Sequence, residues 1–406
     1  PDEVQDEMLL DELRQWCGMR GAPNYMALFE DPGAFSGAAT VSGSGKGALT
    51  DRFKFGKWKE READYAGRHI SQLSDRIAVD QEKYIREQLS LMFLGKDRRA
   101  QVDSPLSRDE IRSYRTVAAQ VQWLARESRP DVAGSASLLA AALPTPSVAD
   151  ALALIKVVKF LKASPEQRLT IWNLDPASVT FVTASDAGGP GSARRGGAQG
   201  ARLIMAADSI IRDNRRARVS VLAWRSLRIK RAVASTVAAE TLALSGATGE
   251  AQWIQVLWRD AVFGDVPRPS WFEGQRPFTV MLAKDCCLGE VASGLSVVDA
   301  KSVFDVLSRN SAGSRADRRN AVELAVIRDS LASVGSRVRW VPHARMPSDP
   351  LTKVDPVSGN HALKDLLSKA SLVLVDEHGH LDERSLNASL KSRSRGASKK
   401  MLDAEG

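Results

Sequence analysis

The stretch Val179-Thr-Phe-Val-Thr-Ala-Ser-Asp186 indicates how the second half of this chain folds. It is an apolar, β-branched run of strand length, and Ala187-Gly-Gly-Pro190 follows it as a turn. Asp186 ends the run, and an acid within an apolar element costs free energy unless it is paired or binds a cation. The alternative for Asp186 alone is an aspartate that opens a turn, which is a common role.

Three further acids stand in or beside apolar elements. They are Glu240 within Val237–Leu244, Asp299 at the end of Leu295–Asp299, and Asp349, one loop after Val338–Val341. At helical spacing, Glu240 shares a mostly apolar stripe with Val237 and Leu244. Acids that converge from separate elements can hold divalent cations, so the four acids predict a common metal site.

Each of these acids also has an ordinary interpretation. Glu240 could lie at the rim of its stripe, paired with Arg231 or Lys230. Asp299 stands where a strand passes into a helix and Asp349 precedes a proline, so both could be helix caps. Taken together, acids at two strand ends, on a helix and on a closing segment are better explained by a shared cation site.

The elements around the acids predict a mixed α/β domain over residues 171–358. Strands are expected at 178–184, 201–206, 219–224, 294–298 and 337–341. Helices are expected at 235–262, 300–308 and 317–333. The predicted fold class is therefore α/β, with a mixed five-stranded sheet and flanking helices.

The preceding region, residues 51–165, is predicted to be mainly helical. Two short strands are expected within 53–59 and 63–70, followed by a helix over Ile77–Leu94. Ser107 and Glu110 have the spacing of a capping box, which predicts a helix from there to about Ala125. Further helices are expected at 132–143 and 148–161.

The two ends of the chain predict little packed structure. Residues 1–50 predict an amphipathic helix over Val4–Trp16 and a flexible linker over Gly33–Gly47. Residues 359–406 predict a short helix and a basic, Ser-rich tail that includes Lys391–Lys400 and is typical of disordered segments. The chain starts at Pro1 rather than Met, so we expect a piece of a longer protein.

The charge balance favours an anionic partner. The 406 residues carry a formal net charge of +8 with a pI of about 9.4. The basic and aromatic candidates for contact with a phosphate backbone are Arg194, Arg195, Trp224, Arg225, Arg228, Lys230 and Arg231. The alternatives are a solvated basic face and a core tryptophan.

Cysteine usage indicates a reducing, intracellular compartment, the cytoplasm or the nucleus. The three cysteines, Cys17, Cys286 and Cys287, cannot form a disulfide framework, and no Cys-x-x-Cys pair or histidine cluster indicates zinc. We expect no membrane span, because no apolar run approaches about 18 residues. The acidic N-terminus lacks the core of a signal peptide.

The chemistry that four carboxylates support is phosphodiester cleavage with two Mg²⁺ ions, for which Mn²⁺ can substitute. Magnesium prefers oxygen ligands, and a pair of ions about 3.5–4 Å apart can grip a scissile phosphate. His343, six residues before Asp349, could move a proton or help the product leave. The alternative for His343 is an ordinary surface histidine.

The ordered motifs of the second half resemble the ribonuclease H domain of copia-type retrotransposon polyproteins. The matching stretches are Ser185-Asp186, Ala223-Trp-Arg-Ser226, Ala234-Ser-Thr-Val-Ala-Ala-Glu240, Val298-Asp-Ala-Lys-Ser302, Asp317–Arg328, Trp340-Val-Pro342 and Ser348-Asp-Pro-Leu-Thr-Lys353. The family patterns are Ser-Asp-Ala, Ser-Trp-Arg-Ser-Lys, Ser-Ser-Thr-Glu-Ala-Glu-Tyr, Asp-Asn-Gln-Ser, a Lys-His-Ile-Asp-Ile-Arg-Tyr-His helix, and Val-Pro with Ala-Asp-Ile-Leu-Thr-Lys. The chain departs from the family at Gly188–Ser192, at Cys286-Cys287 and in the long segment 264–293.

The first half resembles the thumb and connection regions of the same polyproteins. The matching stretches are Ile77–Ile85, Tyr114-Arg115 and Trp123–Asp131, so the resemblance covers about residues 50–355. No Asp-Asp dipeptide occurs anywhere, so the polymerase motif Tyr-x-Asp-Asp is missing. We therefore expect no autonomous DNA synthesis and no palm domain within the chain.

This resemblance implies an endonuclease that cuts the RNA strand of an RNA–DNA hybrid. It carries Asp186, Glu240, Asp299 and Asp349 over as the metal ligands, and implies the palm and fingers of a parent polyprotein as partners. Two alternatives stay open. One is a catalytically inactive relic that only binds nucleic acid, and the other is a polymerase fragment that needs a separate palm.

Overall fold

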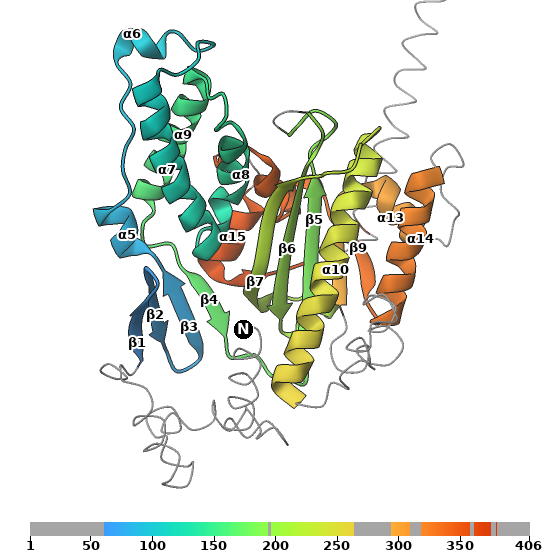
Figure 1. The fold of residues 1–406 in the computed structure, drawn as a ribbon. Helices are drawn as coiled ribbons and strands as arrows, with labels where there is room; N and C mark the ends of the chain where they lie inside the picture. Colours follow the sequence, from blue (N-terminus) through green and yellow to red (C-terminus); the bar gives the residue numbers. More distant parts are fainter. Residues whose placement is uncertain are drawn as a thin grey trace, which may run out of the picture.

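The computed structural model describes residues 61–193, 196–263, 294–308, 318–357, 361–374 and 379 (Figure 1). The predictions for Val4–Trp16, Gly33–Gly47, the strand within 53–59, Cys286-Cys287 and Lys391–Lys400 lie outside the described residues, as do Arg194 and Arg195. None of the described helices is long and apolar enough to cross a membrane.

A six-stranded mixed sheet forms the centre of the second half. Its strands are β5 (Thr180–Ala187), β6 (Gln199–Ala207), β7 (Ala217–Arg228), β8 (Gly294–Val298), β9 (Arg337–Trp340) and β10 (Ser371–Leu372), in the order β10-β7-β6-β5-β8-β9. β5, β6 and β7 form an antiparallel meander, whereas β8 and β9 continue parallel to β5. The predicted mixed α/β fold is confirmed. In this sheet, the prediction lacked the two-residue β10, which pairs with the start of β7.

One face of this sheet carries α10 (Thr236–Phe263), which runs along β5 and β6 in Figure 1. Small side chains allow the close approach, since Ala187 of β5 packs with Ala239 and Ala243 of the helix. Farther along, the rings of Phe181 and Trp258 meet edge to face at 5.9 Å. The helices α13 (Lys301–Ser308) and α14 (Arg318–Ser333) pack beside α10.

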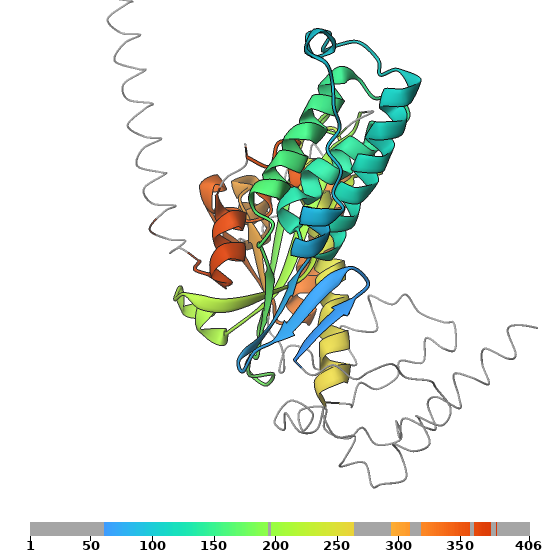
Figure 2. The same cartoon turned by 90° about the vertical axis from the view of Figure 1, so that its left-hand side faces the viewer.

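A helical layer covers the opposite face, and its teal and green helices lie toward the viewer in Figure 2. It consists of α7 (Arg108–Glu127), η1 (Pro130–Val132), α8 (Ala133–Ala141) and α9 (Val148–Ala163). The predicted capping box of Ser107 and Glu110 is confirmed, and Ser147 with Asp150 forms a second one. Buried side chains of this layer, such as Val121 and Leu154, belong to the same core cluster as Val182 of β5.

Three short elements complete this side of the sheet. They are η4 (His343–Arg345), η5 (Asp349–Thr352) and α15 (Ala362–Lys369). All four residues of η5 are buried, and η5 contacts α8 and η1 on one side and β5 and β6 on the other. The segment after β9 is therefore enclosed between the helical layer and the sheet.

A second, four-stranded sheet precedes the helical layer. It has the order β1 (Glu62–Tyr65), β2 (Arg68–Gln72), β3 (Arg76–Asp80) and β4 (Leu169–Trp172), all antiparallel. The predicted strand over 63–70 is a hairpin instead, because Ala66 and Gly67 both take positive φ and turn the chain.

The predicted helix over Ile77–Leu94 is wrong. Ile77 and Val79 pair with Ile171 and Leu169 of β4, so this stretch is strand, and the helix α5 covers only Glu82–Glu87. The Asp80 carboxylate accepts the backbone N–H of Glu82 at 3.1 Å where strand passes into helix. Residues 88–95 form no helix. A second short helix, α6, covers Lys96–Arg99.

Candidate metal centre

Three acids from three elements meet at one end of the six-stranded sheet. Asp186 is the penultimate residue of β5, Asp299 directly follows β8, and Glu240 lies in the second turn of α10. Each offers a carboxylate oxygen, and these oxygens all lie within 4.8 Å of one another. This is the convergence that the sequence predicted for Asp186, Glu240 and Asp299.

The strand register explains why two of the acids meet. Ala184 of β5 pairs with Val297 of the parallel β8, so two residues farther on Asp186 and Asp299 stand side by side. The third acid comes from the helix on one face, where Ala239 packs on Ala187 and the Ala187 backbone hydrogen bonds to Glu240. Parallel neighbouring strands and one packed helix thus suffice to build the group.

Asp349 joins this group through intermediate side chains. It is buried in η5, and its Oδ1 lies 3.5 Å from His343 Nε2 and 3.2 Å from Lys353 Nζ. The other ring nitrogen of His343, Nδ1, lies 2.8 Å from Oδ2 of Asp299. His343 thereby bridges two of the predicted acids, and its side chain is 66% exposed, so the bridge faces solvent.

The Thr352 hydroxyl makes a further link that sequence reasoning missed. Its Oγ1 lies 2.8 Å from Oδ2 of Asp186 and 2.9 Å from the backbone oxygen of Asp349. Lys353 was also missed as a neighbour of the acids. A signal was present in the sequence, since both residues follow Asp349 within the stretch Ser348–Lys353 that carried the resemblance.

Burial and the repulsion of neighbouring acids raise the pKa values of Asp186 and Glu240. Burial, followed by the charge of Asp299, raises the pKa of Asp186 to about 7. Burial, followed by the charges of Asp186 and Asp299, raises the pKa of Glu240 to about 9. The hydrogen bond to Asp299 raises the pKa of His343, which favours the imidazolium form between the acids.

These residues fit a hard divalent cation. The donors are carboxylate oxygens from separate rigid elements, which suit Mg²⁺ or Mn²⁺ better than softer metals. The raised pKa values of Asp186 and Glu240 show that the nearby cationic side chains do not compensate the acids fully. A bound cation would supply the missing positive charge.

The predicted nucleic-acid contacts are spread along β7 and the linker after it. The indole N–H of Trp224 donates to the backbone oxygen of Ala125 at 2.6 Å, and the ring packs against the core. Arg225 pairs with Glu250 at 3.1 Å. Arg228 and Lys230 are exposed. Trp224 therefore has the contacts of a structural side chain, whereas Arg228 and Lys230 face solvent.

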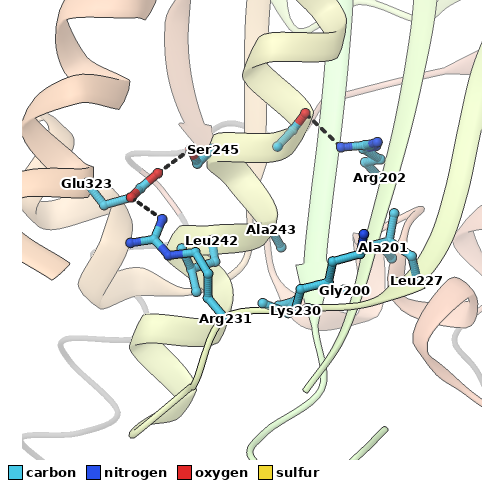
Figure 3. A pocket seen from close by; sticks show the side chains of 12 residues that line it. Gly200, Ala201, Arg202, Leu227, Lys230, Arg231, Leu242, Ala243, Ser245 and Glu323 are labelled. Carbon is cyan, nitrogen blue, oxygen red and sulfur yellow. Dashed lines mark hydrogen bonds and ion pairs between the residues drawn. The ribbon is translucent and has the colours of Figure 1, made fainter. Parts of the chain in front are cut away.

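Arg231 is engaged in a different cluster, at a cavity of about 290 Å³ between β6, β7 and α10 (Figure 3). Arg231 Nη1 and Ser245 Oγ each donate to the Glu323 carboxylate at 2.5 Å. Arg202 Nη1 donates to the Gly246 backbone oxygen at 2.9 Å across the same cavity. Arg231 pairs with Glu323 rather than with Glu240, and the contacts tie α10 to its neighbours.

No protein-family model matches the chain, and no curated protein matches it. Two solved structures are similar to it. The N-terminal RNase H domain of a Mycobacterium tuberculosis protein, solved as a fusion with maltose binding protein, is 19% identical with a TM-score of 0.25, over 48% of this chain and 99% of that chain. RNase H1 from the halophilic archaeon Halobacterium salinarum is 15% identical with a TM-score of 0.24, over 46% of this chain and 98% of that chain.

Proposed function

We propose that the chain is a metal-dependent endonuclease of the ribonuclease H type, which cuts the RNA strand of RNA–DNA hybrids. The observation that carries the proposal is the group formed by Asp186, Glu240 and Asp299, whose carboxylate oxygens lie within 4.8 Å of one another. A structural acid cluster would be expected to carry matching cations, and here the pKa values of Asp186 and Glu240 stay raised instead.

The protein's own groups would have separate tasks in this reaction. Asp186, Glu240 and Asp299 hold the cations, and Asp349 closes the site from η5. When bound, two divalent cations supply an activated water and neutralise the charge that develops on the phosphate and the leaving oxygen. His343 contacts both Asp299 and Asp349 and reaches solvent, so its imidazole can move a proton between the site and water.

The substrate class and origin are supported by charge and by the order of the motifs. A net charge of +8 favours a polyanion. The stretches around Asp186, Glu240, Asp299 and Asp349 follow one another as in copia-type retrotransposon polyproteins. We therefore propose a retrotransposon origin, with the palm and fingers of the parent polyprotein as partners, two Mg²⁺ ions as cofactors and Mn²⁺ as their substitute.

The test is cleavage of a labelled RNA–DNA hybrid with Mg²⁺ or Mn²⁺, alongside single-stranded RNA and duplex DNA. We expect cuts in the RNA strand of the hybrid, and none after Asp186→Asn or Asp299→Asn. The matched control is Asp329→Asn, which neutralises an exposed acid on α14 and should leave the cleavage rate unchanged. Hybrid binding without cleavage under both metals would contradict the nuclease and favour a binding module.

A further inference from the structure

The segment η5 contributes more to the candidate metal centre than the acid Asp349. Thr352, at its other end, is 6% exposed, and its Oγ1 lies 2.8 Å from Oδ2 of Asp186. The same hydroxyl lies 2.9 Å from the backbone oxygen of Asp349. One short segment therefore touches Asp186 and also carries the fourth acid.

A hydroxyl on one carboxylate oxygen restricts the rotation of the whole group. With Oδ2 of Asp186 engaged by Thr352, the plane of the carboxylate is set relative to Glu240 and Asp299. Side chains that orient a metal ligand in this way change metal affinity without touching the metal. Thr352 has the position and the burial for that task.

The location of η5 is set from the helical layer by a glycine. If Gly134 of α8 carried a Cβ atom, that atom would lie 2.6 Å from the Pro350 oxygen and 2.7 Å from the carbonyl carbon and oxygen of Leu351. All three are backbone atoms of η5, so the segment itself would have to move. Gly134 is the second residue of α8, and the absence of a side chain there allows this backbone-to-backbone contact.

The residues just before α8 are held by a buried guanidinium. The guanidinium of Arg129, which is fully buried just before η1, donates to Asp131 at 3.0 and 2.8 Å. It also donates to the Ser164 backbone oxygen at 2.8 Å, at the end of α9. The helix end that touches η5 is thus anchored to the rest of the helical layer.

We propose that Thr352 is a positioning residue for Asp186, and that the close contact of α8 with η5 at Gly134 sets its place. The helical layer then completes the metal centre instead of merely preceding it. The consequence for catalysis rests on the proposed function, whereas the consequence for metal binding can be measured without it.

The first test separates the hydroxyl of Thr352 from its shape. Thr352→Val keeps the shape and removes the hydroxyl, while Thr352→Ser keeps the hydroxyl. Titration calorimetry with Mg²⁺ and with Mn²⁺ should show about 10–100-fold weaker binding for the valine variant and affinity within a few-fold of the original for serine. Thr248→Val is the matched control, because that buried hydroxyl donates within α10, to the Leu244 oxygen at 2.9 Å.

The second test displaces η5 by adding a side chain to α8 at Gly134. Gly134→Ala should weaken metal binding and lower kcat on the hybrid by about 10-fold or more, with hybrid affinity retained. Gly249→Ala is its control, since a Cβ there meets nothing within 4 Å on the exposed face of α10. Circular dichroism and thermal unfolding check that each variant folds.

The double variant decides whether the two residues act through one route. Because Gly134→Ala already displaces Thr352 together with the rest of η5, adding Thr352→Val should cost little more metal affinity than Gly134→Ala alone. Fully additive losses, or wild-type Mg²⁺ affinity in Thr352→Val, would overturn the proposal. A protein that binds Mg²⁺ but cuts no hybrid contradicts the proposed function alone, since the affinities still decide this inference. If the unaltered protein binds neither metal, both fall.

Discussion

Two carboxylates, Glu240 on α10 and Glu323 on the neighbouring α14, lie in opposite electrostatic surroundings. Glu323 accepts hydrogen bonds from Arg231 and Ser245, and these outweigh its burial, so its pKa is lowered. Glu240, five residues before Ser245 on the helix, is buried beside Asp186 and Asp299, and its pKa is raised to about 9. Glu323, paired with Arg231, contributes to the stability of the fold. The group of Asp186, Glu240 and Asp299 lacks a matching positive charge, which a bound cation would supply. Two neighbouring helices, α10 and α14, thus carry acids in opposite electrostatic states.

The largest expected difference is in catalysis. Glu240→Gln removes a proposed metal ligand, and cleavage of the hybrid should fall by more than about 100-fold, since even side chains behind the ligands are worth about 10–100-fold. Glu323→Gln removes a carboxylate of the same type from the other cluster, and its rate should stay within a few-fold of the original. Single-turnover kinetics at saturating Mg²⁺ measures both. Equal losses in the two variants would remove the distinction between the clusters.

The same pair of substitutions should have opposite effects on the stability of the metal-free protein. Glu240→Gln removes a buried group with a raised pKa, so it should stabilise the fold by on the order of 1–3 kcal/mol at pH 7. Glu323→Gln removes a compensated carboxylate and should destabilise it by about 1 kcal/mol. Urea unfolding in the presence of a chelator gives both free energies.

The pH dependence of these stability changes has a definite sign. The pKa of Glu240 is 4.5 in its ordinary state and about 9 here, so the gain from Glu240→Gln is absent below about pH 4.5 and grows toward pH 9. The lowered pKa of Glu323 gives the reverse case, because its stabilisation is present at neutral pH and is lost as the pH falls. If the change in unfolding free energy followed the same pH dependence in both variants, the opposite pKa shifts of Glu240 and Glu323 would be contradicted.

A smaller effect is expected in the coupling of metal binding to protons. Because the pKa values of Asp186 and Glu240 are raised to about 7 and about 9, Mg²⁺ must displace protons from the site near neutral pH. Mg²⁺ affinity should therefore rise by about 10-fold or more between pH 6 and pH 9. Calorimetry in two buffers of different ionisation enthalpy counts the protons released. Glu323→Gln should leave that count unchanged, and pH-independent affinity would contradict the raised pKa values.

Local sequence patterns sufficed for most of the six-stranded sheet and for three of the acids. The runs ending at Asp186 and Asp299 are strands because they are apolar and β-branched, and their parallel pairing brings the acids together. Glu240 could be placed because the apolar stripe of its helix indicates which face packs on the sheet.

What could not be predicted depends on partners far away in the chain. Ile77–Asp80 has a pattern compatible with helix, and it becomes strand because β4, about 90 residues later, pairs with it. The role of Thr352 is a contact with Asp186, 166 residues away, and a lone hydroxyl carries no local signal of it. The need for a glycine at position 134 likewise follows from the close contact with the backbone of η5, about 216 residues later, which no local pattern indicates. Tertiary placement decides these cases, and composition does not.

The smallest expected effects are on the salt dependence of hybrid binding. They should differ between exposed basic residues and basic residues that are held in ion pairs. Arg228 and Lys230 are exposed, and no ion pair of theirs is found among the residues that the structure describes, so both can reach phosphates. Arg225 and Arg231 are held by Glu250 and Glu323.

Lys230→Gln should lower the slope of log affinity against log salt by about 1, as expected for one phosphate contact. Arg231→Gln should change the slope less, because the Arg231 guanidinium is already paired with the Glu323 carboxylate. Fluorescence anisotropy with a labelled hybrid in Ca²⁺ from low to moderate salt measures the slopes. A larger change for Arg231→Gln would mean that the hybrid displaces Glu323 and that the compensated cluster, too, belongs to the binding surface.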